Sequence, residues 1–307
     1  MREDLEVAGV PIVLTLGPSF FHWPPDRITD FYRRIADEAP VERVHVGEVV
    51  CGKRMPFSDP VWPEVIERLE RAGKEVVLST LAMPTLPRER RAIEELCADG
   101  RLVEINDVTA LPARAGQPFV AGPFMNVYNE ATARFLVRRG AGTICPPVEL
   151  SLATVGAIAA ACTEAEFEVF AFGRLPLALS GRCYHARLHG LHKDSCQFTC
   201  EQDPDGLVVE TLDDQAFLAM NGVQTLSAQV QAILSPPADL AVHHIRRLRL
   251  SPHTCDMVAV ARTYRALLAG EMAPAEAHAA LVGLALPGGL VDGYARGAAG
   301  SLPVASA

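Results

Sequence analysis

Short apolar runs alternate with amphipathic segments along the first 170 residues of the chain. VPIVLTLG is a continuous apolar strand, and residues 25–37 after it place Ile28, Phe31, Tyr32 and Ile35 at helical spacing. The alternation continues through six further strand-like runs, VERVHVGEVV, EVVLST, LVEIND, FVAGPFMNVYN, GTICPP and EFEVFAFG, with helices expected at 62–72, 87–99, 130–139 and 151–161. Continuous apolar strands that alternate with helices indicate βα units and a buried parallel sheet.

Seven such units, with an eighth strand at HHIRRLRL, predict an α/β fold of the (β/α)8-barrel type, irregular or incomplete in part. A doubly wound open sheet is the alternative, because the number of strands does not separate the two. We expect one domain over residues 1–286, with a cysteine-bearing loop and a small insert after strand seven, at about residues 181–240. Residues 287–307 are rich in Gly, Ala, Ser and Pro, which predicts a flexible tail.

Composition sets the broad class of the protein. Of the 307 residues, 49% are hydrophobic and 21% charged, as in ordinary globular proteins. The net charge of −9 argues against binding along a phosphate backbone, so we expect no nucleic-acid partner. The start, MREDLEVAGV, does not have the pattern of a signal peptide, and no apolar run approaches the roughly 20 residues of a transmembrane helix. We therefore expect a cytoplasmic protein.

Three cysteines, Cys183, Cys196 and Cys200, lie within one polar, glycine-punctuated stretch that reads as an irregular loop. Their neighbours are Arg, His, Lys, Asp, Gln and Glu, so apolar packing explains them poorly. In a reducing compartment, clustered thiols more often bind metal or carry out redox chemistry than form disulfides.

The C-x12-C-x3-C spacing suits a cubane iron–sulfur cluster or a zinc ion with a remote fourth ligand, and the spacing does not decide between them. Cys51 and Cys145 both follow strand-like runs and compete for the fourth position. For His185, His189 and His192 in the same loop, a solvated loop is the favoured interpretation over ligation.

Polar residues at two other strand ends are candidates for holding a substrate. Asn126 and Asn129 follow the fifth strand, and Glu149 follows the sixth, so all three are expected at the barrel mouth. Ser151 is better explained as the N-cap of the next helix. We identify no catalytic residue, because the sequence has no G-x-S-x-G elbow, no H-E-x-x-H helix and no P-loop.

Taken together, GEVVCGKR, ELSL, SGRCY, Cys196-x3-Cys200 and TLDDQAFLAMNGVQTLS resemble the collagenase-like peptidase family, most closely its ubiquinone-biosynthesis branch. The resemblance extends from about residue 10 to about residue 270. It implies that Cys51, Cys183, Cys196 and Cys200 form one ligand set, and so favours Cys51 over Cys145.

The resemblance also implies a 4Fe–4S cluster on these thiolates and a heterodimer with the sister protein UbiU. A UbiT-like lipid-carrier accessory protein is the further partner it implies, and a ubiquinone precursor, hydroxylated without dioxygen, is the implied substrate. Other family members are linked to hydroxylation of RNA bases, which the acidic balance of this chain makes less fitting. Two rival interpretations remain: a non-catalytic partner subunit stabilised by metal, and a zinc-dependent, peptidase-like hydrolase.

Overall fold

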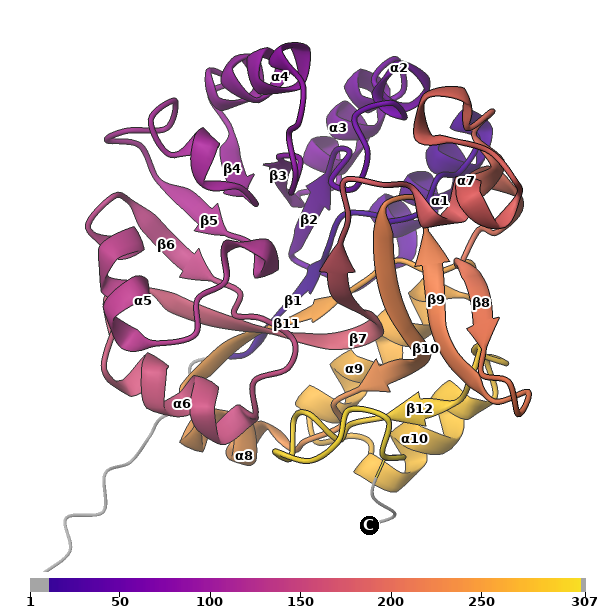
Figure 1. Ribbon diagram of the computed structural model, residues 1–307. Helices are drawn as coiled ribbons and strands as arrows, with labels where there is room; N and C mark the ends of the chain where they lie inside the picture. Colours follow the sequence, from indigo (N-terminus) through magenta and orange to yellow (C-terminus); the bar gives the residue numbers. More distant parts are fainter. Residues whose placement is uncertain (1–10, 305–307) are drawn as a thin grey trace, which may run out of the picture.

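A closed barrel of eight parallel strands forms the centre of the computed structural model, which describes residues 11–304 (Figure 1). Closure depends on one strand, Ile245–Leu250 (β11), which pairs in parallel with the seventh strand on one side and with the first on the other. Leu248, for example, stands opposite both Val169 and Leu14. The other barrel strands are β1 Val13–Leu16, β2 Arg43–Val46, β3 Glu75–Ser79, β4 Leu102–Ile105, β5 Phe119–Ala121, β6 Ala141–Ile144 and β7 Glu166–Leu179.

The predicted barrel is therefore confirmed, with HHIRRLRL as its eighth strand, and the alternative of an open sheet is wrong. The larger helices around the barrel are α1 Pro25–Glu38, α3 Trp62–Arg71, α4 Pro87–Cys97, α5 Glu130–Val137, α6 Leu152–Ala160 and α9 Met257–Leu268. Amphipathic patterning explains their positions: α3 buries Val65 and Leu69 and leaves Glu67 and Arg71 in solvent.

The ring of helices is irregular, as expected. Only a short 3-10 helix, Val108–Ala110 (η1), lies between β4 and β5. Smaller elements stand outside the regular βα units: α2 Met55–Ser58, α7 Tyr184–Leu188, α8 Pro237–Val242, α10 Pro274–Val282, η2 Pro123–Met125, η3 Lys193–Ser195 and η4 Thr199–Gln202.

The insert after strand seven extends the sheet beyond the barrel. β7 continues to Leu179, and its second half pairs antiparallel with β10 (Gln224–Ala232). β9 (Ala216–Asn221) and β8 (Leu207–Glu210) follow in antiparallel order. The predicted Asn221-Gly222 turn joins β9 to β10, because Gly222 adopts the positive φ of 63° that such a turn requires.

The segment after Pro287 requires a correction. We expected a flexible tail, but Leu290–Val291 forms β12, which pairs in parallel with β10. Both residues are buried, and Val291 also bridges to Pro303. The reason is local: two adjacent apolar residues find pairing partners on β10, a contact that the composition of the segment conceals. Residues 305–307 of the expected tail lie outside the described residues, as does the start of the chain, where we read no signal peptide.

Between residues 11 and 304, no helix has the length and apolar character needed to cross a membrane.

Candidate functional site

Three of the four predicted metal-binding cysteines lie on the β7–β8 connection, residues 183–200, here called the three-cysteine segment. Cys183 is the N-cap of α7, Cys196 follows η3, and Cys200 lies within η4. The segment is thus more ordered than the irregular loop we expected. Between Cys196 and Cys200, Gln197 and Phe198 both have positive φ values, 48° and 53°, a strained turn that brings the chain back on itself.

Cys51 comes from the loop after β2, and two sets of contacts fix that loop. The amides of Val50 and Cys51 donate to Glu48 Oε1 at 2.8 and 2.9 Å. Lys53 Nζ donates to the carbonyl oxygens of Lys193 at 2.6 Å and Asp194 at 3.1 Å. The loop of Cys51 is therefore tied directly to the three-cysteine segment, 140 residues away in sequence.

A buried guanidinium, Arg54, lies near Cys51 and Cys200. It donates to the carbonyl oxygen of Phe20 and to Asn221 Oδ1, both at 2.8 Å. Burial alone would lower the pKa of Arg54, but the neighbouring Cys200, Glu48 and Cys51 raise it above its ordinary value.

Burial raises the pKa of the Cys183 thiol, and the neighbouring Cys200 and Cys196 raise it further. The amide of Ala186 and the charge of Arg54 oppose that rise. Burial likewise raises the pKa of Cys51, while Arg54 opposes that rise. The four cysteines predicted as ligands, together with Arg54, are here called the thiol site.

Cys145, the competing fourth ligand, lies elsewhere. Its thiol is fully buried inside the barrel near Arg249, Glu168 and Glu104, and burial raises its pKa strongly. The structure therefore groups Cys51, rather than Cys145, with the three-cysteine segment.

The sulfur atoms of the thiol site are not drawn together as they would be around one bound zinc ion. Zinc bound tetrahedrally at about 2.3 Å holds its sulfur ligands ~3.8 Å apart. Among residues 11–304, no three of these sulfur atoms lie within 4.8 Å of one another. The amide of Ala186 also points at Cys183 Sγ, 3.4 Å away, as a hydrogen-bond donor to sulfur.

A second feature is an open cavity of about 300 Å³ at the C-terminal ends of strands β3 to β7, here called the mouth pocket. It contains two of the three predicted substrate residues, Asn126 and Glu149. Asn129 instead caps α5, because its Oδ1 accepts from the amide of Thr132 at 2.9 Å. Ser151 caps α6 in the same way, as expected.

Tyr128, which the sequence did not single out, completes the polar side of the mouth pocket. Its hydroxyl donates to Glu149, and burial together with that carboxylate raises the pKa of Tyr128 to about 12. Asn126 beside it has a positive φ of 54°. Asp107 also lines the cavity, and none of the described lining residues is Lys, Arg or His. Such a pocket favours an uncharged ligand that donates hydrogen bonds over an anion.

A short aromatic contact connects the mouth pocket with the thiol site. Phe124 lines the pocket, and its ring centroid lies 5.9 Å from that of Phe20. The carbonyl of Phe20 accepts the hydrogen bond from Arg54. Phe124 and Phe20 therefore connect the mouth pocket with Arg54 of the thiol site.

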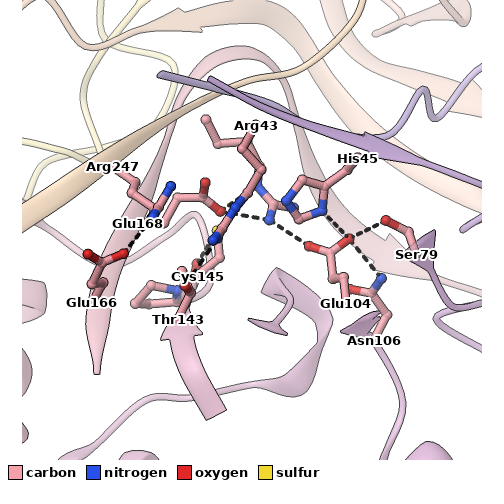
Figure 2. Close-up of polar contacts among 12 residues, drawn as sticks. Arg43, His45, Ser79, Glu104, Asn106, Thr143, Cys145, Glu166, Glu168 and Arg247 are labelled. Atoms are coloured by element: carbon pink, nitrogen blue, oxygen red, sulfur yellow. Dashed lines mark hydrogen bonds and ion pairs between the residues drawn. The ribbon is translucent and has the colours of Figure 1, made fainter. Parts of the chain in front are cut away.

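Below the mouth, the barrel is filled by charged rather than aliphatic side chains (Figure 2). Figure 2 shows Glu104 facing His45, Ser79 and Asn106, with Glu168 on the far side. Arg249 Nη2 joins Glu104 Oε1 at 2.5 Å and Glu168 Oε2 at 2.7 Å. Burial alone would raise the pKa of both carboxyl groups, but Arg249 lowers each below its ordinary value. We call this the barrel network.

Comparison with known proteins gives the family. The model of Peptidase family U32 matches residues 25–277. Among solved structures, the U32 peptidase Mk0906 has 12% identity and a TM-score of 0.42, over 80% of this chain and 94% of that one. A phospho-2-dehydro-3-deoxyheptonate aldolase from Thermotoga maritima has 14% identity and a TM-score of 0.36, over 52% of each chain. D-psicose 3-epimerase from Clostridium cellulolyticum H10 has 11% identity and a TM-score of 0.32, over 89% of this chain and 98% of that one.

Proposed function

The chain belongs to peptidase family U32, and from this premise we propose that it is the iron–sulfur subunit of an oxygen-independent hydroxylation system in ubiquinone biosynthesis. In this proposal it resembles the UbiV proteins and works as a heterodimer with UbiU, with a UbiT-like lipid carrier as accessory protein. The observation that carries the proposal is the contact between the Cys51 loop and the three-cysteine segment, made by the Lys53 hydrogen bonds to Lys193 and Asp194 beside the buried Arg54.

Cys51, Cys183, Cys196 and Cys200 would hold a 4Fe–4S cluster, which when bound supplies one-electron redox chemistry. Arg54 would offset the negative charge of the thiolates, since its guanidinium is buried among them and held by Phe20 and Asn221. The amide of Ala186 would donate to the Cys183 sulfur.

The mouth pocket is our candidate for the ring of the ubiquinone precursor. A phenolic hydroxyl can donate to Glu149 as the Tyr128 hydroxyl does now, while Asn126 offers an amide at the rim. Leu177 lines the same cavity and is 40% exposed, an apolar exit for the substituent of the ring. The contact from Phe124 to Phe20 would keep this ring near the thiol site.

Iron and acid-labile sulfide, measured after strictly anaerobic purification, test the cofactor. We expect about four of each per chain in the natural protein and loss of both in Cys51→Ala. Cys145→Ala is the matched control, because Cys145 also follows a strand and competed with Cys51 as the fourth ligand. This variant should keep its iron. Zinc without sulfide would contradict the proposal and support a structural metal or a hydrolase.

The reaction is tested in cells that lack this chain. Grown without oxygen, they should accumulate a ubiquinone precursor that lacks a ring hydroxyl, and the natural chain should restore the product while Cys51→Ala should not. Restoration by Cys51→Ala, or a normal quinone content without the chain, would contradict the proposed role.

A further inference from the structure

Two histidines and an aspartate meet beside the thiol site, and they form a group separate from the four thiols. His185 lies in α7, His189 follows as its C-cap, and Asp203 follows η4. The nitrogen and oxygen atoms that the three side chains offer all lie within 4.8 Å of one another. The two imidazole rings are nearly parallel, with centroids 5.4 Å apart and an interplanar angle of 13°.

A hydrogen bond on the opposite edge fixes the orientation of His185. Its Nδ1 lies 3.1 Å from the carbonyl oxygen of Met220, which can only accept, so Nδ1 carries a hydrogen and Nε2 is turned toward Asp203. The side chain is fully buried, and Nε2 has no hydrogen-bond partner among residues 11–304.

Asp203 Oδ2 lies 3.0 Å from His185 Nε2. A cation held between the two atoms stabilises this contact: a proton needs only these two atoms, whereas a metal ion also uses His189. His189 is exposed and supplies the third donor from the solvent side.

We propose that His185, His189 and Asp203 form a second metal site, which binds a transition-metal dication of the zinc type. Two imidazole nitrogens and one carboxylate oxygen suit Zn²⁺ or Co²⁺, whereas Mg²⁺ and Ca²⁺ prefer oxygen ligands. His185 and His189 are four residues apart in sequence, which is the spacing of the two zinc-binding histidines in the H-E-x-x-H motif. The bond from Nδ1–H to a backbone carbonyl is the usual support of a metal-bound histidine.

The position of this site gives it a role for the loop. α7 begins directly after Cys183, and Asp203 stands three residues after Cys200, so one ion would join the two ends of the three-cysteine segment. In this proposal, metal binding stabilises the conformation of that segment. It uses none of the four thiols, so it does not depend on the proposed cluster.

Titration with Co²⁺ and Zn²⁺ under anaerobic conditions tests the site in the full-length protein. Cobalt held by nitrogen and oxygen gives visible bands without the near-ultraviolet absorption of thiolate-bound cobalt, so the two sites are told apart. We expect one cobalt ion of the first kind per chain, and a Zn²⁺ affinity lowered more than about tenfold in His189→Gln and Asp203→Asn.

His192→Gln is the matched control, an exposed histidine of the same segment outside the group, and should bind as the natural protein does. Added Zn²⁺ should raise the Tm of the natural protein and of His192→Gln but not of His189→Gln. Equal metal affinity in His189→Gln and the natural protein, or cobalt bound only by thiolate, would overturn the proposal. Because His189 is exposed, its replacement should leave the Tm measured without metal unchanged. Asp203→Asn is a second test, at a residue that follows η4.

Discussion

At the residue scale, the two carboxylates of the barrel network depend on a single guanidinium. Glu104 and Glu168 are fully buried, and Arg249 contacts both. Removing one partner of such a group leaves charge uncompensated in the interior, so Glu104→Gln should cost about 3–5 kcal/mol of unfolding free energy in urea. Glu67→Gln, which breaks the exposed pair with Arg71, should change it by less than about 0.5 kcal/mol. Similar small losses in both variants would mean that the barrel network contributes little.

The sequence predicts individual site residues where a local rule applies. Asn126 and Glu149 were found because they follow strands, and Cys51 lies beside the three-cysteine segment as the family resemblance implies. Tyr128 was missed because nothing in its neighbours signals that its hydroxyl faces Glu149. The partners of Arg54 were missed for a related reason: Asn221 is 167 residues away in sequence.

At the element scale, the β9–β10 turn bears on the thiol site through Gly222. A Cβ there would lie 2.7 Å from Arg54 Nη2, in addition to the strain of the positive φ. Gly270 has a similar φ of 71°, and a Cβ added there would have no atom within 4 Å. Gly270→Ala therefore measures the cost of the backbone strain alone, about 1–2 kcal/mol of unfolding free energy. Gly222→Ala should cost about 1–3 kcal/mol more in urea unfolding, because Arg54 loses a buried hydrogen bond. Equal costs would show that Arg54 moves aside freely.

β12 gives the second prediction at this scale. Leu290 is buried against the core although its surroundings are glycine-rich, and composition alone therefore described the segment poorly. Leu290→Ala should lower the unfolding free energy by about 2–3 kcal/mol, whereas Leu302→Ala, at a 43% exposed position, should lower it by less than about 1 kcal/mol. No effect of Leu290→Ala would restore our original expectation of a flexible tail.

At the scale of the whole molecule, the alternation of strands and helices was enough to predict a barrel, but not how it closes or what fills it. Closure requires β11 to pair with β7 and with β1, contacts between segments far apart in the sequence that periodicity does not encode. Glu104 lies in the four-residue β4 and Glu168 in the 14-residue β7, and the other residues of both strands are mostly apolar, so nothing local shows that these charges point inward. The alternating pattern therefore fixes the class of fold, while the polar interior follows only from the assembled ring.

That interior makes the stability of the whole barrel sensitive to acid. Burial lowers the pKa of His45 below its ordinary 6.5, so the unfolded chain binds this proton more readily and stability begins to fall below about pH 6.5. Arg249 holds the pKa values of Glu104 and Glu168 below the ordinary 4.5. Their contribution is therefore complete above about pH 4.5 and is lost as the pH falls further. Urea unfolding from pH 8 to pH 3 should show a nearly constant free energy above pH 7 and an increasing loss below, approaching about 1.4 kcal/mol per pH unit for each group. Glu104→Gln removes one of these groups, so the unfolding free energy of this variant should fall less steeply below pH 4.5. An unchanged slope would mean that the protons taken up on unfolding bind to groups outside the barrel network.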